Sequence, residues 1–135
     1  MNPPLKYQEG YRFQVWEDYA IQTQMPGDVV SDFYRLQSGL LIIRKGYAWD
    51  GASGPVTIQT DTNKIASLVH DVFFQMLRNK ELPHDPCFHI ANQELRRLCL
   101  EDGMWRLRAN YFYRAVESFG NAHAAVQPGK VLTAP

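Results

Sequence analysis

Apolar and polar residues alternate along the first part of the chain in the manner of a β-strand. Over residues 11–21 the alternation centres on Phe13, Val15 and Trp16, which predicts a strand with one buried face. The Pro-Gly-Asp tripeptide at 26–28 is a turn signal. Apolar runs at 32–36 and 40–44 flank residues 37–39, a link of hairpin length. We therefore predict strands and turns over residues 1–60.

The pattern changes to helical spacing over residues 61–120. Asp61 is suited to cap a first helix, and Asn79 and Pro83 are suited to end it. One face of this helix is apolar and carries Ile65, Leu68, Val69, Val72, Phe73, Met76 and Leu77.

Two more helices follow. The second is predicted to begin near Pro86, behind Asp85, and to end at Gly103. The third is predicted to end at Gly120 and to bury one stripe formed by Trp105, Ala109, Phe112, Val116 and Phe119. Residues 121–135 show no periodicity and are interpreted as a tail. Strands followed by helices predict a single α+β domain over residues 1–135, with an N-terminal antiparallel sheet packed against three C-terminal helices.

Composition excludes several classes of protein. The chain has 14 Lys+Arg and 14 Asp+Glu, so its net charge is zero, which disfavours a highly basic nucleic-acid binder or a polybasic membrane protein. Apolar residues make up 45% of the chain, which is too many for a disordered protein. No apolar run reaches the ~20 residues of a membrane helix, and the N-terminus does not resemble a signal peptide. We expect a protein of a host cytoplasm or of a virion.

The cysteines predict neither a disulfide nor a zinc site. Cys87 and Cys99 fall in one predicted helix, roughly 18 Å apart, which is too far for a disulfide and indicates two reduced, buried thiols. His84, Cys87 and His89 offer only three zinc ligands at irregular spacing, so we do not predict zinc.

Two polar side chains occupy informative positions in the helices. On a helical wheel of the first helix, His70 lies about 100° from the centre of the apolar arc, at its flank, while Asp71 lies on the far side. This helix is therefore expected to be covered on more than one side, with His70 at the join. Asn92 lies inside the apolar stripe of the second helix, where a buried amide needs hydrogen-bond partners. We predict a pair between His70 and Asn92, with a His70 bonded only to a backbone carbonyl as the alternative.

The segment at 46–55, Gly-Tyr-Ala-Trp-Asp-Gly-Ala-Ser-Gly-Pro, resembles the "glycine, then Asp-x-Ala-Ser-x-Pro" loop of a phage and prophage family, domain of unknown function 1353. The resemblance continues through the Ala-rich segment with the His-Asp pair at 66–74, through Ala-Asn-Gln-Glu-Leu at 91–95, and through Gly103 to Ser-Phe-Gly at 118–120. It covers residues 38–120. Where this chain has Asn92, the family usually has Asp. The resemblance implies a phage or prophage source and no particular activity, because the family is uncharacterised.

These positions suggest a hydrolase-like site formed by Asp50, Ser53, His70, Asp71 and Asn92. His70, held by Asn92, would act as a general base on a water molecule, and Ser53 as nucleophile is a second version. Asp71 and Asp50 would hold a divalent cation such as calcium, which prefers oxygen ligands. The arrangement is similar in outline to secreted phospholipase A2, although the disulfides of that family are missing here. Equally, Asp50 and Ser53 would form side-chain-to-backbone turns with no catalytic role.

A second class of function fits the same chain. Aromatic residues near the N-terminus, including Tyr7, Tyr11, Trp16 and Tyr19, suit an interface, which favours a non-catalytic structural or assembly protein of the phage particle. The partners would then be other phage structural proteins or a second copy of the chain. Arg96, Arg97, Arg106 and Arg108 are too few to predict nucleic-acid binding.

Overall fold

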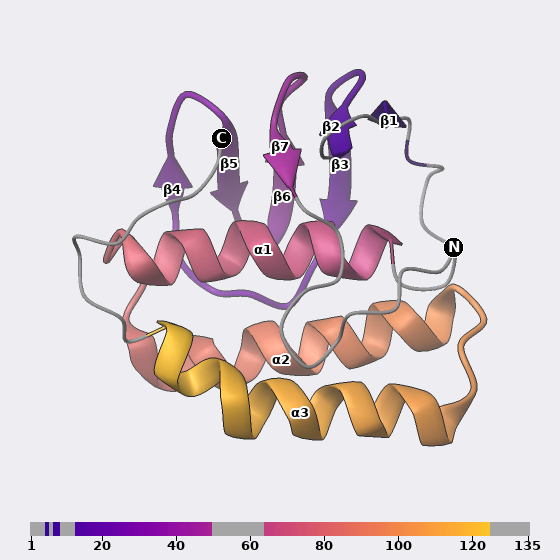
Figure 1. Ribbon diagram of the computed structural model, residues 1–135. Helices are drawn as coiled ribbons and strands as arrows, with labels where there is room; N and C mark the ends of the chain where they lie inside the picture. The colour runs from indigo at the N-terminus through magenta and orange to yellow at the C-terminus, as the bar shows by residue number, and fades with distance from the viewer. Residues whose placement is uncertain (1–4, 6, 9–12, 50–63, 125–135) are drawn as a thin grey trace.

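The computed structural model describes residues 5, 7–8, 13–49 and 64–124, and it has an α+β architecture (Figure 1). Strands lie on one side of helix α1 (Lys64–Arg78), and helices α2 (His84–Glu101) and α3 (Arg106–Ala124) lie on the other. The predicted order of strands and then helices is confirmed. Among the described residues, no helix is long and apolar enough to cross a membrane.

The strands form two antiparallel sheets. In the smaller sheet, β2 (Phe13–Val15) pairs with both β1 (Tyr7–Gln8) and β7 (Ala48–Trp49). The larger sheet has the order β3 (Tyr19–Gln22), β6 (Leu40–Ile43), β5 (Tyr34–Gln37) and β4 (Val29–Val30). Burial alternates along β3 and β5, so one face of the larger sheet contributes side chains to the core.

The hairpin predicted around residues 37–39 is present as β5 and β6. Ser38 and Gly39 connect the strands with positive φ angles of 51° and 81°, a conformation suited to a two-residue hairpin turn. A Cβ atom at Gly39 would lie 2.4 Å from the carbonyl oxygen of Thr23, so this position has no room for a side chain.

The strand predicted over residues 11–21 is divided between the two sheets. The chain leaves β2 at Val15 and enters β3 at Tyr19, and the residues between them form bends. Trp16 is therefore 56% exposed instead of half-buried, whereas Tyr19 is buried in the core and does not contribute to an aromatic surface.

Helix α1 lies between the strand layer and the other two helices (Figure 1). This position explains why nine of its fifteen residues are buried, including Phe74, which lies off the main apolar stripe. The expectation of a helix covered on more than one side is confirmed.

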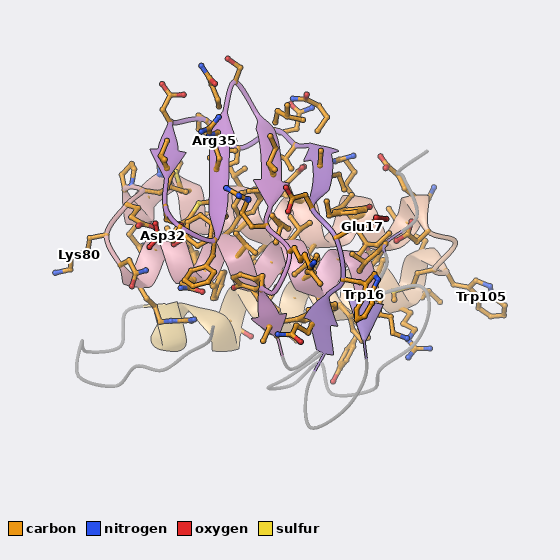
Figure 2. All side chains as sticks on the ribbon, turned by 90° about the horizontal axis from the view of Figure 1, so that it is seen from above. Trp16, Glu17, Asp32, Arg35, Lys80 and Trp105 are labelled. Atoms are coloured by element: carbon orange, nitrogen blue, oxygen red, sulfur yellow. The ribbon has the colours of Figure 1, made fainter. Side chains whose placement is uncertain are left out.

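The other two helices agree with their predicted cores and differ at their ends. Cys87 and Cys99 are buried free thiols, as predicted. In α3, Ala109, Phe112 and Val116 are buried, also as predicted. Trp105 was wrongly assigned to this stripe: it precedes the helix, is 83% exposed and projects from the molecule (Figure 2). Gly120 does not end the helix, which continues to Ala124, because a single glycine costs only about 1 kcal/mol and does not break a helix.

A buried carboxylate attaches α2 to the strand layer. The guanidinium of Arg97 donates to both oxygens of Glu94, at 3.0 and 2.7 Å, and Glu94 also accepts from the backbone N–H of Gln24 at 3.1 Å. Arg97 reaches the carbonyl oxygen of Gln22, at the end of β3, at 3.3 Å. These contacts fix the position of α2, which carries Asn92.

Candidate functional site

His70 of α1 and Asn92 of α2 are hydrogen-bonded, as the sequence predicted. The distance from His70 Nε2 to Asn92 Oδ1 is 2.7 Å. Asn92 is completely buried, and His70 is partly buried with its ring 4.1 Å from the ring of Phe74, one turn later on α1. Both polar groups therefore lie between two apolar helix faces and satisfy each other.

Further hydrogen bonds connect Asn92 to the third helix. Asn92 Nδ2 donates to Oε2 of Glu117 at 2.7 Å, and His89 Nδ1 lies 2.8 Å from Oε1 of the same carboxylate. His70, Asn92, Glu117 and His89 thus form one polar network that joins α1, α2 and α3. A connected network of this kind restricts how the three helices pack, because a displaced helix would leave buried polar groups without partners.

The direction of these hydrogen bonds determines which ring nitrogen of neutral His70 carries the proton. A carboxylate oxygen accepts, so the Asn92 amide nitrogen must face Glu117 and its carbonyl oxygen must face His70. His70 therefore carries its proton on Nε2 and donates it to Asn92. In the neutral ring the lone pair lies on Nδ1, and among the described residues the hydrogen bond of the His70 ring is made through Nε2.

Burial keeps His70 neutral. The pKa of His70 is lowered to about 4, mainly by loss of hydration and to a smaller extent by the positive charge of Arg78, two turns along α1. The bond to Asn92 acts in the opposite direction and does not offset the burial. His70 is therefore an uncharged base at neutral pH.

Among the described residues, the hydrogen bonds that join His70, Asn92, Glu117 and His89 do not involve Asp71. Its negative charge contributes to the raised pKa of Tyr47, after the larger effect of burial, so Asp71 lies near the strand-layer side of α1. The hydroxyl of Tyr47 donates to Oε1 of Gln75 on the same helix, at 2.9 Å. The neighbouring residues His70 and Asp71 consequently act in different surroundings, as expected for side chains about 100° apart on a helix.

Asp50 and Ser53 lie outside the described residues, so their predicted places in the site stay predictions. The residue immediately before them is fixed. Trp49 Nε1 donates to Oγ of Ser67 at 3.2 Å, and Ser67 Oγ donates in turn to the carbonyl oxygen of Lys64 at 3.0 Å. The chain therefore enters the 50–55 segment in contact with α1, one turn before His70.

The described residues do not provide a metal site. No three of the His, Cys, Asp and Glu side chains in that part of the chain come close enough together to hold an ion. His84 stacks on Phe88 with ring centroids 5.1 Å apart, and His89 is engaged with Glu117. The calcium prediction depends on Asp50 and is not tested by these residues.

Glu117 and His89 are the members of the network that the sequence analysis missed. Glu117 lies about 100° from the centre of the buried stripe of α3, which is the flank position that made His70 informative on α1. The position of Glu117 at the flank of the apolar stripe could therefore have identified it from the sequence. His89 is exposed and carries no such signal.

Comparisons with protein-family models, with curated proteins and with solved structures find no match to this chain.

Proposed function

We propose that this protein is a phage- or prophage-encoded accessory protein with a hydrolytic centre in which His70 is the general base. The observation that carries the proposal is the hydrogen bond from His70 Nε2 to Asn92, which orients the imidazole and leaves the lone pair on Nδ1. An imidazole oriented by an amide or carboxylate partner is the arrangement that hydrolases use to remove a proton from water or from a hydroxyl.

In the proposed reaction, Nδ1 of His70 accepts a proton from a water molecule as the water oxygen attacks the carbonyl carbon of an ester. The tetrahedral intermediate then breaks its bond to the alkoxide, and His70 returns the proton to this leaving group, which releases an acid and an alcohol. Asn92 holds the ring orientation but does not take the proton, because an amide is not a base. The contact between Trp49 and Ser67 supports a contribution from Asp50 and Ser53, since Trp49, the residue before Asp50, contacts the same helix one turn from His70. Asp50 would orient the substrate or water, and Ser53 would serve as the alternative nucleophile.

The proposed phage source depends on the resemblance of residues 38–120 to domain of unknown function 1353. A protein of that source would act in the host cytoplasm or in the particle, with other phage structural proteins or a second copy of itself as partners.

A second candidate function is a structural or assembly component without catalysis. It is favoured by the continuation of the polar network from Asn92 to Glu117 and His89, which gives His70 a purely structural reason to be bonded. The low pKa of His70, about 4, also makes it a weak base.

Hydrolysis assays distinguish the two candidates. We expect wild-type protein to hydrolyse at least one member of a panel of chromogenic acyl esters and phosphodiesters, assayed with and without calcium. We expect His70→Gln to lower the rate at least a hundredfold, because the base is removed. The wild-type rate should rise with pH through the pKa of His70, near 4, and then stay level to neutral pH.

His89→Gln is the matched control, since it removes the other histidine of the network and leaves His70 in place. It should retain most of the activity. Turnover that is equal in wild type and in folded His70→Gln, or no turnover of any substrate, would reject catalysis and support the structural role. Circular dichroism of each variant establishes that it is folded.

A further inference from the structure

A polar groove of about 410 Å³ is lined by residues of α2 and α3, and none of the residues that line it belongs to the His70–Asn92–Glu117–His89 network. Its lining consists of Gln93, Arg96, Asn110, Tyr113 and Arg114. Gln93 and Arg114 are exposed, and the other three side chains are partly buried, so the groove opens to solvent. Its volume falls within the range of roughly 300–1,000 Å³ that is typical of small-molecule sites.

The groove is positively charged. None of its lining residues is acidic, and within the described chain neither Arg96 nor Arg114 forms an ion pair. Arg97, by contrast, is paired with both Glu94 and Glu101. The groove therefore holds two guanidinium groups that no described carboxylate neutralises.

The carboxylate one turn after Arg114 on α3 is already engaged, as Glu94 on α2 is with Arg97. Glu117, one turn after Arg114 on α3, bonds Asn92 through Oε2 and His89 through Oε1. Both oxygens of Glu117 are therefore hydrogen-bonded within the polar network, and Glu117 does not line the groove.

The guanidinium of Arg96 is held in place by a hydrogen bond. Its Nε donates to Oδ1 of Asn110 across the two helices at 2.6 Å. This bond fixes the plane of the guanidinium and leaves its terminal nitrogens free to donate in parallel to an oxyanion. Gln93 and Tyr113 add an amide and a hydroxyl, which are further hydrogen-bond donors.

We infer that this groove binds a small polar molecule that carries two negative charges on its oxygen atoms, either on one group, as in a phosphate monoester, or on two, as in a dicarboxylate. Two unneutralised guanidiniums match a double negative charge, and the planar donor groups match the geometry of phosphate or carboxylate oxygens. The volume exceeds what the anion alone requires, so the amide and hydroxyl groups would contact the remainder of the ligand. This inference is independent of catalysis by His70.

The test is a two-dimensional ¹H–¹⁵N NMR titration at constant ionic strength, with inorganic phosphate, glycerol phosphate and succinate as separate probes. We expect saturable shifts confined to residues 93–96 and 110–114 with at least one probe, and the phosphate and succinate arms identify the preferred oxyanion. Arg114→Gln should weaken binding at least tenfold. Arg96→Gln should do the same, but it also loses the Asn110 bond, so its thermal unfolding is measured in parallel.

Arg35→Gln is the control for net charge, because Arg35 is an exposed arginine of β5 in the strand layer, remote from α3 (Figure 2). It should leave the affinity unchanged. The inference is overturned if no probe binds saturably, or if Arg35→Gln weakens binding as much as Arg114→Gln. Binding of an acidic peptide such as hexaglutamate, with none of the three small anions binding, would assign the groove to a protein partner and would also overturn it.

Discussion

Replacing Asn92 with leucine is expected to destabilise the protein by about 3 kcal/mol. The substitution keeps the number and branching of heavy atoms in a completely buried side chain and removes both of its hydrogen bonds. The Nε2–H group of His70 is then left without an acceptor between apolar helices, and Glu117 loses its donor from Asn92. An unsatisfied buried polar group costs about 1–3 kcal/mol, and more if it is charged. Urea unfolding, followed by circular dichroism, measures the change.

Gln93→Leu is the matched control for this substitution. It replaces the adjacent amide on the same helix, but Gln93 is exposed, so its free energy of unfolding should change by less than about 0.5 kcal/mol. If Asn92→Leu is as stable as wild type, the network does not hold the three helices together. A more stable Asn92→Leu variant would lead to the same conclusion, because the packing of leucine would then stabilise the fold more than the hydrogen bonds of Asn92 do.

The free energy of unfolding is expected to fall as the pH is lowered from about 6.5 to about 4, with His70 as one cause. The pKa of His70 is about 4 in the folded protein and 6.5 in the unfolded chain. Between these values the unfolded chain binds a proton that the folded protein does not bind, so acid favours unfolding. The expected contribution of His70 is a loss of about 2 kcal/mol by pH 5 and about 3 kcal/mol by pH 4.

The contribution of His70 is isolated by comparing wild type with His70→Gln at each pH. All other ionisable groups are common to both proteins, so the difference in pH dependence reports the imidazole of His70. The wild type should lose stability relative to the variant as the pH falls. Parallel curves for the two proteins between pH 7 and pH 4 would mean that His70 titrates alike in the folded and unfolded states.

The helical wheel predicted the centre of the site because the relevant contacts are between regular helices. Asn92 occupies a core position on its helix, and His70 lies at the edge of the core on another helix. Each polar side chain therefore needed a hydrogen-bond partner on a neighbouring helix. Their bond of 2.7 Å confirms this inference. Glu117 occupies a comparable flank position on α3 and could have been found in the same way.

The predictions that were wrong concern residues outside a regular element, or residues whose conformation depends on a contact distant in sequence. Trp105 fits the apolar spacing of α3, but it precedes the first helical residue, so helical spacing does not predict the direction of its side chain. The strand expected at residues 11–21 is interrupted at Asp18, whose carboxylate accepts from the backbone N–H of Lys45 at 2.8 Å. That contact spans 27 residues and leaves no trace in the local alternation of apolar and polar side chains.

The state of the His70 ring is the central claim, because the proposed catalysis requires a lone pair on Nδ1 and the pH dependence requires a lowered pKa. ¹⁵N NMR of the histidine rings measures it directly. We predict that the His70 ring at pH 7 is neutral with its proton on Nε2, and that Nδ1 gains a proton only near pH 4. A proton on Nδ1 at pH 7, or titration near the ordinary value of about 6.5, would contradict the assignment of Nδ1 as a free, neutral base.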